Sequence, residues 1–204
     1  NDTVRIGCAT ALIATLSSVA AGIVARVATD RWIGVFEYVC TARLVDAGYW
    51  LGAAAVPALL ASVTGLSNVG IVWLLSLTAP STGATSGLLL GALILMPVAV
   101  LGGVCLGIFA AGLGLYLSDP YTGSNVLSII LPVSAGVIVP VSTYPAWLAW
   151  LCSWVPGSRL VQALDTSGGI ASGAAPDLFA LLAVDTALAG LYRRIRAGAR
   201  ASLL

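Results

Sequence analysis

The sequence predicts an all-α protein, a polytopic helix bundle in a membrane. Hydrophobic residues make up 59% of the 204 residues and charged residues only 8%, whereas an average soluble domain is about 25% charged. Such a chain cannot cover a globular surface with polar groups. Several uncharged runs reach the roughly 20 residues that cross a bilayer, and arginines gather at their ends. We therefore expect a single transmembrane domain over residues 1–204.

The first expected span is residues 6–25, an uncharged run bracketed by Arg5 and Arg26. The second, residues 49–77, is longer than one crossing needs and contains Pro57. We expect one tilted or broken helix there, because two spans would need a turn within very few residues.

The polar stretch 78–87 is rich in Pro, Gly, Ser and Thr and predicts an exposed loop. A third span is expected at residues 88–116. The fourth apolar stretch, residues 126–139, would rise only about 21 Å as a helix, which is short of a full crossing. The last expected span is residues 178–192, which arginines follow directly.

Small residues repeat every fourth position in the third span, at Gly103, Gly107 and Ala111. This spacing permits close contact between helices. We favour packing within the chain over a dedicated dimer seam. Asp185 is the one charge well inside an expected span, and an intramembrane carboxylate is by default a functional candidate. A structural pairing with the neighbouring arginines is the alternative.

Between the first two spans, residues 30–46 predict an amphipathic helix in the inner interface of the membrane. Thr29 or Asp30 could cap its N-terminus. One face would carry Trp32, Phe36, Val39 and Cys40, and the opposite face Asp30, Gly34, Glu37 and Thr41. The helix either docks a cytoplasmic partner through its polar face or simply rests on lipid.

Residues 140–155 predict an outer re-entrant hairpin that follows the short fourth stretch. Its prolines and tryptophans are Pro140, Pro145, Trp147, Trp150, Trp154 and, just after it, Pro156. The three tryptophans would share one face of a short helix, and tryptophan prefers the headgroup level. An ordinary span followed by a loop is the alternative.

Orientation follows from the arginines, because cytoplasmic loops carry an excess of basic residues. Seven of the nine, Arg26, Arg31, Arg43, Arg193, Arg194, Arg196 and Arg200, fall on one side when the spans alternate. That side and the C-terminus are expected to be cytoplasmic, in the cell (inner or plasma) membrane, and residues 140–177 outside. Asn1 would then lie outside, so we expect that one upstream helix is missing from this chain.

Several chemistries are excluded by composition. The chain has no His and no Lys, so His-based catalysis and His-containing metal sites cannot exist in it. We expect no catalytic residues, no metal site and, at a net charge of +1, no nucleic-acid partner. The cysteines, Cys8, Cys40, Cys105 and Cys152, lack paired spacing and are expected to be small buried hydrophobes.

Two stretches resemble the permease subunit of ABC-2 type exporters, the type V permease fold. The pattern D-R-x-x-G-T-x-E of the family's coupling helix is similar to Asp30-Arg31-Trp32-Ile33-Gly34-Val35-Phe36-Glu37, with Val35 in place of threonine. The late pattern S-G-V-x-x-P-x-x-x-x-P-x-W-L is similar to Ser134–Pro140 and Pro145–Leu148. Gln162 stands where the family usually has an acid.

This resemblance implies an exporter that moves a hydrophobic or amphiphilic substrate out of the cytoplasm. A partner ABC ATPase would bind ATP and Mg, since this chain has no phosphate-binding loop and needs no cofactor of its own. A second permease copy or paralogue and membrane lipid would be the other partners. Asp30–Asp46 would enter a cleft of the ATPase, the outer hairpin would form the extracellular gate, and residues 6–25 and 126–139 would line the path.

Two other functions compete with this one. A proton-coupled secondary carrier could use Asp185, although the expected inverted repeats are not evident. A non-transporting membrane scaffold, or an integral-membrane lipid enzyme, is the third class, and the scattered acids argue against the enzyme.

Overall fold

The computed structural model describes residues 2–36, 38, 47–78, 83–116, 121–137, 143–153 and 156–166. Every regular element in these ranges is a helix, and the order is α1 (Asp2–Trp32), α3 (Ala47–Thr78), α4 (Gly83–Tyr116), α5 (Thr122–Ser134), α6 (Ala146–Ser153) and α7 (Pro156–Thr166). The all-α class is therefore confirmed for this part of the chain.

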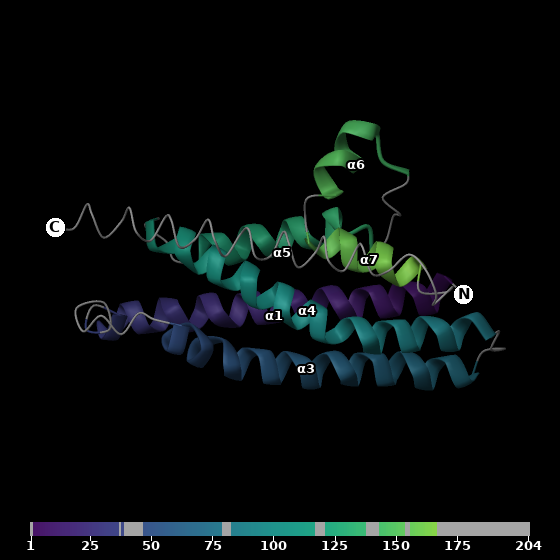
Figure 1. The fold of residues 1–204 in the computed structure, drawn as a ribbon, viewed down its shortest axis with the longest axis horizontal. Coiled ribbons are helices and arrows are strands. Elements are labelled where there is room, and N and C mark those ends of the chain that lie inside the picture. Colours follow the sequence, from purple (N-terminus) through teal and green to yellow (C-terminus); the bar gives the residue numbers. More distant parts are fainter. Residues whose placement is uncertain are drawn as a thin grey trace.

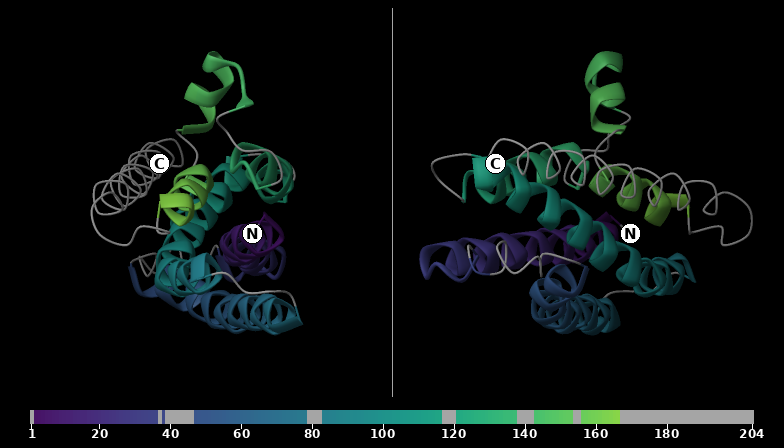
Figure 2. Two further views of the ribbon diagram at one scale, coloured as in Figure 1. Left: turned by 90° about the vertical axis from the view of Figure 1, so that its right-hand side faces the viewer. Right: turned by 60° about the vertical axis from the view of Figure 1, so that its left-hand side comes forward.

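Helix α1 is the centre of the bundle, in contact with α3, α4, α5 and α7 (Figures 1 and 2). Its most apolar window is 61% buried, against 17% for that of α3. Helix α3 is therefore peripheral, and its outward side carries large exposed apolar side chains such as Leu59, Leu60 and Val63. A bilayer is the solvent in which such a face carries no penalty.

Within the described ranges, three helical stretches are long and apolar enough to cross a membrane: Thr3–Trp32, Gly48–Leu77 and Ser86–Gly112. The chain is therefore membrane-associated. These stretches contain or overlap the three long spans expected from the sequence, and the run with Pro57 is one continuous helix as expected. The expected span at 178–192 lies outside the described residues.

Helices α5 and α7 follow one another along α1 in the same direction. Ser124 and Leu127 of α5 face Ala20 and Ala21 of α1. At the start of α7, a Cβ on Gly157 would lie 3.0 Å from Ile13 Cδ1. Both helices run antiparallel to α1 (Figure 1), and α7 lies to one side of α5, in contact with α4 and α1 (Figure 2).

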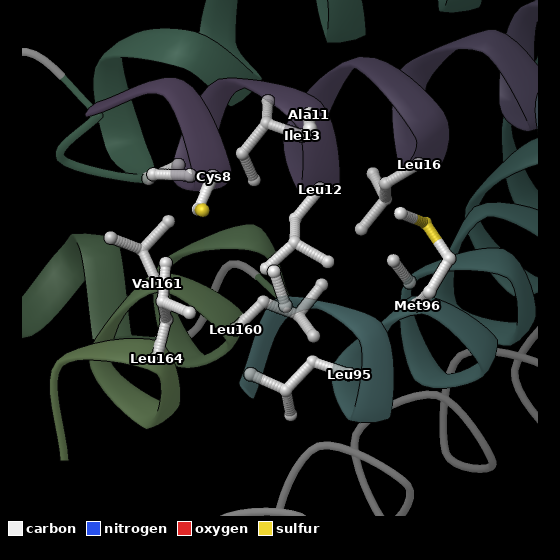
Figure 3. Close-up of a cluster of buried hydrophobic side chains, with 14 of the residues drawn as sticks. Cys8, Ala11, Leu12, Ile13, Leu16, Leu95, Met96, Leu160, Val161 and Leu164 are labelled. Atoms are coloured by element: carbon white, nitrogen blue, oxygen red, sulfur yellow. The ribbon is translucent and has the colours of Figure 1, made fainter. Parts of the chain in front are cut away.

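The sequence prediction placed residues 140–177 outside the membrane and did not include α7 in the core of the bundle. Leu160 and Leu164 are fully buried, and Figure 3 shows them facing Leu12 of α1 and Leu95 of α4. The physical reason is the apolar side of this short helix, which fills the space beside α1 beyond the end of α5. Cys8 joins the same cluster and Cys152 is also buried, as expected of small hydrophobes, whereas Cys105 is only partly buried. Cys40 lies outside the described residues.

Only part of the expected hairpin lies within the described residues. Helix α6 stands away from the bundle in every view (Figures 1 and 2), and the chain after it continues as α7 in the direction of α5. Pro140 and Trp154 lie outside the described residues, so the complete hairpin stays a prediction.

Candidate functional site

The candidate coupling residues Asp30, Arg31 and Trp32 belong to the last turns of α1. The expected cap at Thr29 or Asp30 is therefore wrong. The Thr29 hydroxyl donates to the carbonyl of Ala25 at 2.8 Å, as a residue inside a helix does, and the carboxylate of Asp30 is engaged by side chains instead of backbone amides. The other residues of the expected helix 30–46, Glu37 among them, lie largely outside the described part.

Helix α1 ends instead at a turn over Ile33 and Gly34. The amide of Ile33 donates to the carbonyl of Thr29 at 3.0 Å, and that of Gly34 to Arg31 at 3.1 Å. Gly34 has φ of +79°, a left-handed conformation that glycine adopts without steric cost and that commonly ends helices. The glycine of the motif is thus a helix terminator.

Asp30 is the centre of a polar cluster between α1 and α3. Its side chain is 8% exposed, and Arg26 Nε lies 3.5 Å from its Oδ1. The hydroxyl of Tyr49, in the first turn of α3, donates to its Oδ2 at 2.9 Å. A buried carboxylate needs such partners, so Asp30 ties the end of α1 to the start of α3.

Arg31 makes the corresponding link to α4. Its Nη1 donates to the carbonyl oxygen of Gly114 at 3.2 Å. Gly114 lies in the last turn of α4, where carbonyl groups lack helical partners and the helix dipole favours a cation. The Asp-Arg pair of the motif therefore holds two different helices to the end of α1.

Three aromatic rings extend this junction. Phe36, just after the turn, packs edge to face on Tyr49 with ring centroids 6.1 Å apart, and Tyr49 packs on Trp50 at 5.4 Å. Tyr49 and Trp50 were not singled out from the sequence. The only signal available was an aromatic pair at the start of a span, where such residues often mark the interface.

Next to this junction lies an exposed apolar patch, which consists of Trp32, Ile33, Val35 and Tyr38. Trp32 is 81% exposed and Tyr38 78%. The patch follows directly on the anchored residues Asp30 and Arg31. The motif is thus divided into an anchored half and an exposed half.

At the other candidate site, α6 exposes its aromatic side chains. Trp147 is 67% exposed and Trp150 62%. The amides of Leu148 and Ala149 both donate to the carbonyl of Pro145 at 2.9 Å, so Pro145 starts this helix, and Pro156 is the first residue of α7. The described residues bring none of these side chains near Asp30, and Asp185 lies outside them.

The small residues of α4 pack within the chain, as expected. A Cβ on Gly103 would lie 2.7 Å from the carbonyl oxygen of Leu16, and one on Gly107 would lie 2.9 Å from Ala20 Cα. Ala111 is buried in the same contact with α1. Because these residues already pack against α1, they cannot form a dimer interface with a second copy of the chain.

The described residues contain no group of three or more Cys, Asp or Glu side chains that could hold a metal ion. Comparison with protein families, curated proteins and solved structures finds no match to this chain.

Proposed function

We propose that the chain is the permease subunit of an ATP-driven ABC-2 type exporter. The observation that carries this proposal is the division of the stretch 30–38. Asp30 and Arg31 are bonded to α3 and α4, while the next residues form the exposed apolar patch. A cluster of exposed aromatic and apolar side chains that begins at the last residue of a span and continues beyond it suits a protein-binding surface.

Because the neighbouring residues Asp30 and Arg31 are bonded to α3 and α4, a movement of this patch would be transmitted to several helices. A force on Trp32 would reach α1 directly, α3 through Asp30 and Tyr49, and α4 through Arg31 and Gly114. The three longest helices would therefore respond together to a partner. A partner ATPase that closes on ATP could then drive the bundle between two conformations, provided that it binds them with different affinity.

The seam between α1 and α5 supports the expected path. Ser17 of α1 faces Ser124 and Ser128 of α5 across a void of about 20 Å³. The resemblance assigns these two helices to the substrate path, and the small side chains on both sides of the seam allow the helices to lie close together. We infer a closed conformation of the path that opens when α5 moves from α1, with α6 and its tryptophans as the outer gate.

Co-purification tests the proposal. The tagged chain is purified from its native membrane, and proteins that accompany it are identified by mass spectrometry. We expect an ATPase with a phosphate-binding loop, encoded beside this chain. Trp32→Ala and Glu37→Arg should each lower the amount recovered, because they alter the patch and the polar end of the motif.

Trp73→Ala is the matched control, since Trp73 is an exposed tryptophan on α3 that belongs to no proposed site. It should leave recovery unchanged. Recovery of no ATPase would refute the proposal, and equal recovery with both patch variants would refute the assignment of the patch. Transport that needs a proton gradient and Asp185 but no ATP would favour the secondary carrier.

A further inference from the structure

An open groove of about 660 Å³ lies between α1 and α3, at the end where α1 ends and α3 begins. Its lining changes character along its length. Arg26, Asp30 and Tyr49 lie at one end, and Val56 and Pro57 at the other. Asp30 and Tyr49 also belong to the anchor described above, but the open space of the groove has no role in the function proposed there.

The depth of the groove in the membrane follows from the sequence of α1. Residues 6–25 carry no charge and rise about 30 Å, the thickness of the hydrocarbon core. Arg26 is the first charged residue beyond them, so we infer that its guanidinium lies at the level of the lipid phosphates. Gly22, one turn earlier in α1, and Pro57, almost three turns into α3, then line the part of the groove within the hydrocarbon.

Arg26 is able to bind a further anion. Its side chain is 63% exposed, and its Nε lies 3.5 Å from the Asp30 carboxylate. That carboxylate is itself buried and accepts from Tyr49. The side chain is largely exposed although it pairs with Asp30, and a guanidinium has five N–H donors, so it can bind a phosphate in addition to the carboxylate.

The α3 wall of the groove is open to the surrounding lipid. Gly48, Gly52 and Val56 are exposed on that side. A Cβ added at Gly48 or Gly52 would meet no atom within 4 Å. Glycine at these positions leaves a hollow as deep as the backbone, which suits a flexible chain lying along the helix.

We propose that this groove binds one phospholipid molecule, whose phosphate contacts Arg26 and one of whose acyl chains lies between α1 and α3. The polar end at phosphate depth and the apolar end in the hydrocarbon match the two parts of a lipid in their order and direction. The proposal rests on membrane insertion alone and not on the exporter function.

Native mass spectrometry of the full chain, delipidated in detergent, tests this. The probes are phosphatidylglycerol, diacylglycerol with the same acyl chains, and glycerol 3-phosphate. We expect phosphatidylglycerol to be retained as a single copy. The other two should be retained at least about tenfold less, because diacylglycerol lacks the phosphate and glycerol 3-phosphate lacks the acyl chains. Equal retention of diacylglycerol would overturn the role of Arg26, and equal retention of glycerol 3-phosphate would overturn the acyl-chain groove.

Two variants locate the site. Arg26→Gln should reduce phosphatidylglycerol retention about tenfold, toward that of diacylglycerol. Gly52→Leu should reduce it similarly by filling the groove. Gly70→Leu is the matched control, because Gly70 also lies on α3 with no atom within 4 Å of an added Cβ but outside the groove. Unchanged retention with both Arg26→Gln and Gly52→Leu would overturn the proposal.

The same spectra report the competing occupant. If the chain is a dimer that Gly52→Leu separates and Gly70→Leu does not, a second copy covers the groove and the lipid proposal is wrong. Arg26→Gln leaves the backbone and the apolar contacts intact, so it tests the proposal even if Gly52→Leu fails to fold.

Discussion

The hydroxyl of Tyr49 donates a hydrogen bond of 2.9 Å to the buried carboxylate of Asp30. This bond joins the last turns of α1 to the first turn of α3, on either side of the turn at Gly34. It places a charge that local sequence would assign to a helix cap inside a junction of two membrane helices.

Tyr49→Phe should destabilise the protein by about 1.5–3 kcal/mol, because a buried carboxylate loses one of its hydrogen bonds. Thermal unfolding of the purified chain in detergent measures the change. The same substitution in an Asp30→Ala background serves as the control and should have a much smaller effect. Equal effects in both backgrounds would show that the Tyr49 hydroxyl does not act through the Asp30 carboxylate, and would contradict this prediction.

Gly103→Ala should destabilise the bundle by about 1–3 kcal/mol, the usual range for overpacking. Its new methyl would lie 2.7 Å from the carbonyl oxygen of Leu16 and 2.8 Å from Val19 Cβ, so α4 must move away from α1. Gly70→Ala makes the same chemical change on an open surface and should be neutral or stabilising by up to about 1 kcal/mol. Unfolding by a denaturing detergent compares the two, and identical midpoints would contradict the close contact.

Leu160→Ala should lower the unfolding free energy by about 2–3 kcal/mol. Leu160 is fully buried, and its loss leaves a cavity between α7 and α1. We expect the low end of the usual range because the chain exchanges protein contacts for apolar lipid and not for water. Leu77→Ala, on the exposed side of α3, is the control. A negligible effect of Leu160→Ala would place α7 outside the core.

Single cysteines at the two ends of α1 test the orientation. In a background without native cysteines, Trp32→Cys and Thr3→Cys each expose a thiol, since both positions are exposed. A membrane-impermeant maleimide added to intact cells should label Thr3→Cys and spare Trp32→Cys, because the arginine distribution places the end with Trp32 in the cytoplasm. Labelling in the reverse pattern would invert the orientation and remove the patch from reach of a cytoplasmic ATPase.

Composition and the length of the apolar runs suffice to predict the all-α class and the positions of the three long helices. In a bilayer each backbone amide must bond within its own helix, so a long apolar run becomes a helix whatever its neighbours are. That is why the expected spans 6–25, 49–77 and 88–116 match α1, α3 and α4. The close packing of Gly103 and Gly107 could also be expected, because their spacing is a local property.

The end of α1 and the position of α7 depend instead on contacts between segments that are far apart in the chain. Asp30 looks locally like a helix cap, but its partner Tyr49 is 19 residues away, and Gly114, the partner of Arg31, is 83 residues away. Likewise, α7 is short, and its place in the core depends on the space that α1 and α5 leave beside it. These outcomes rest on contacts between distant segments, which no local pattern of residues contains.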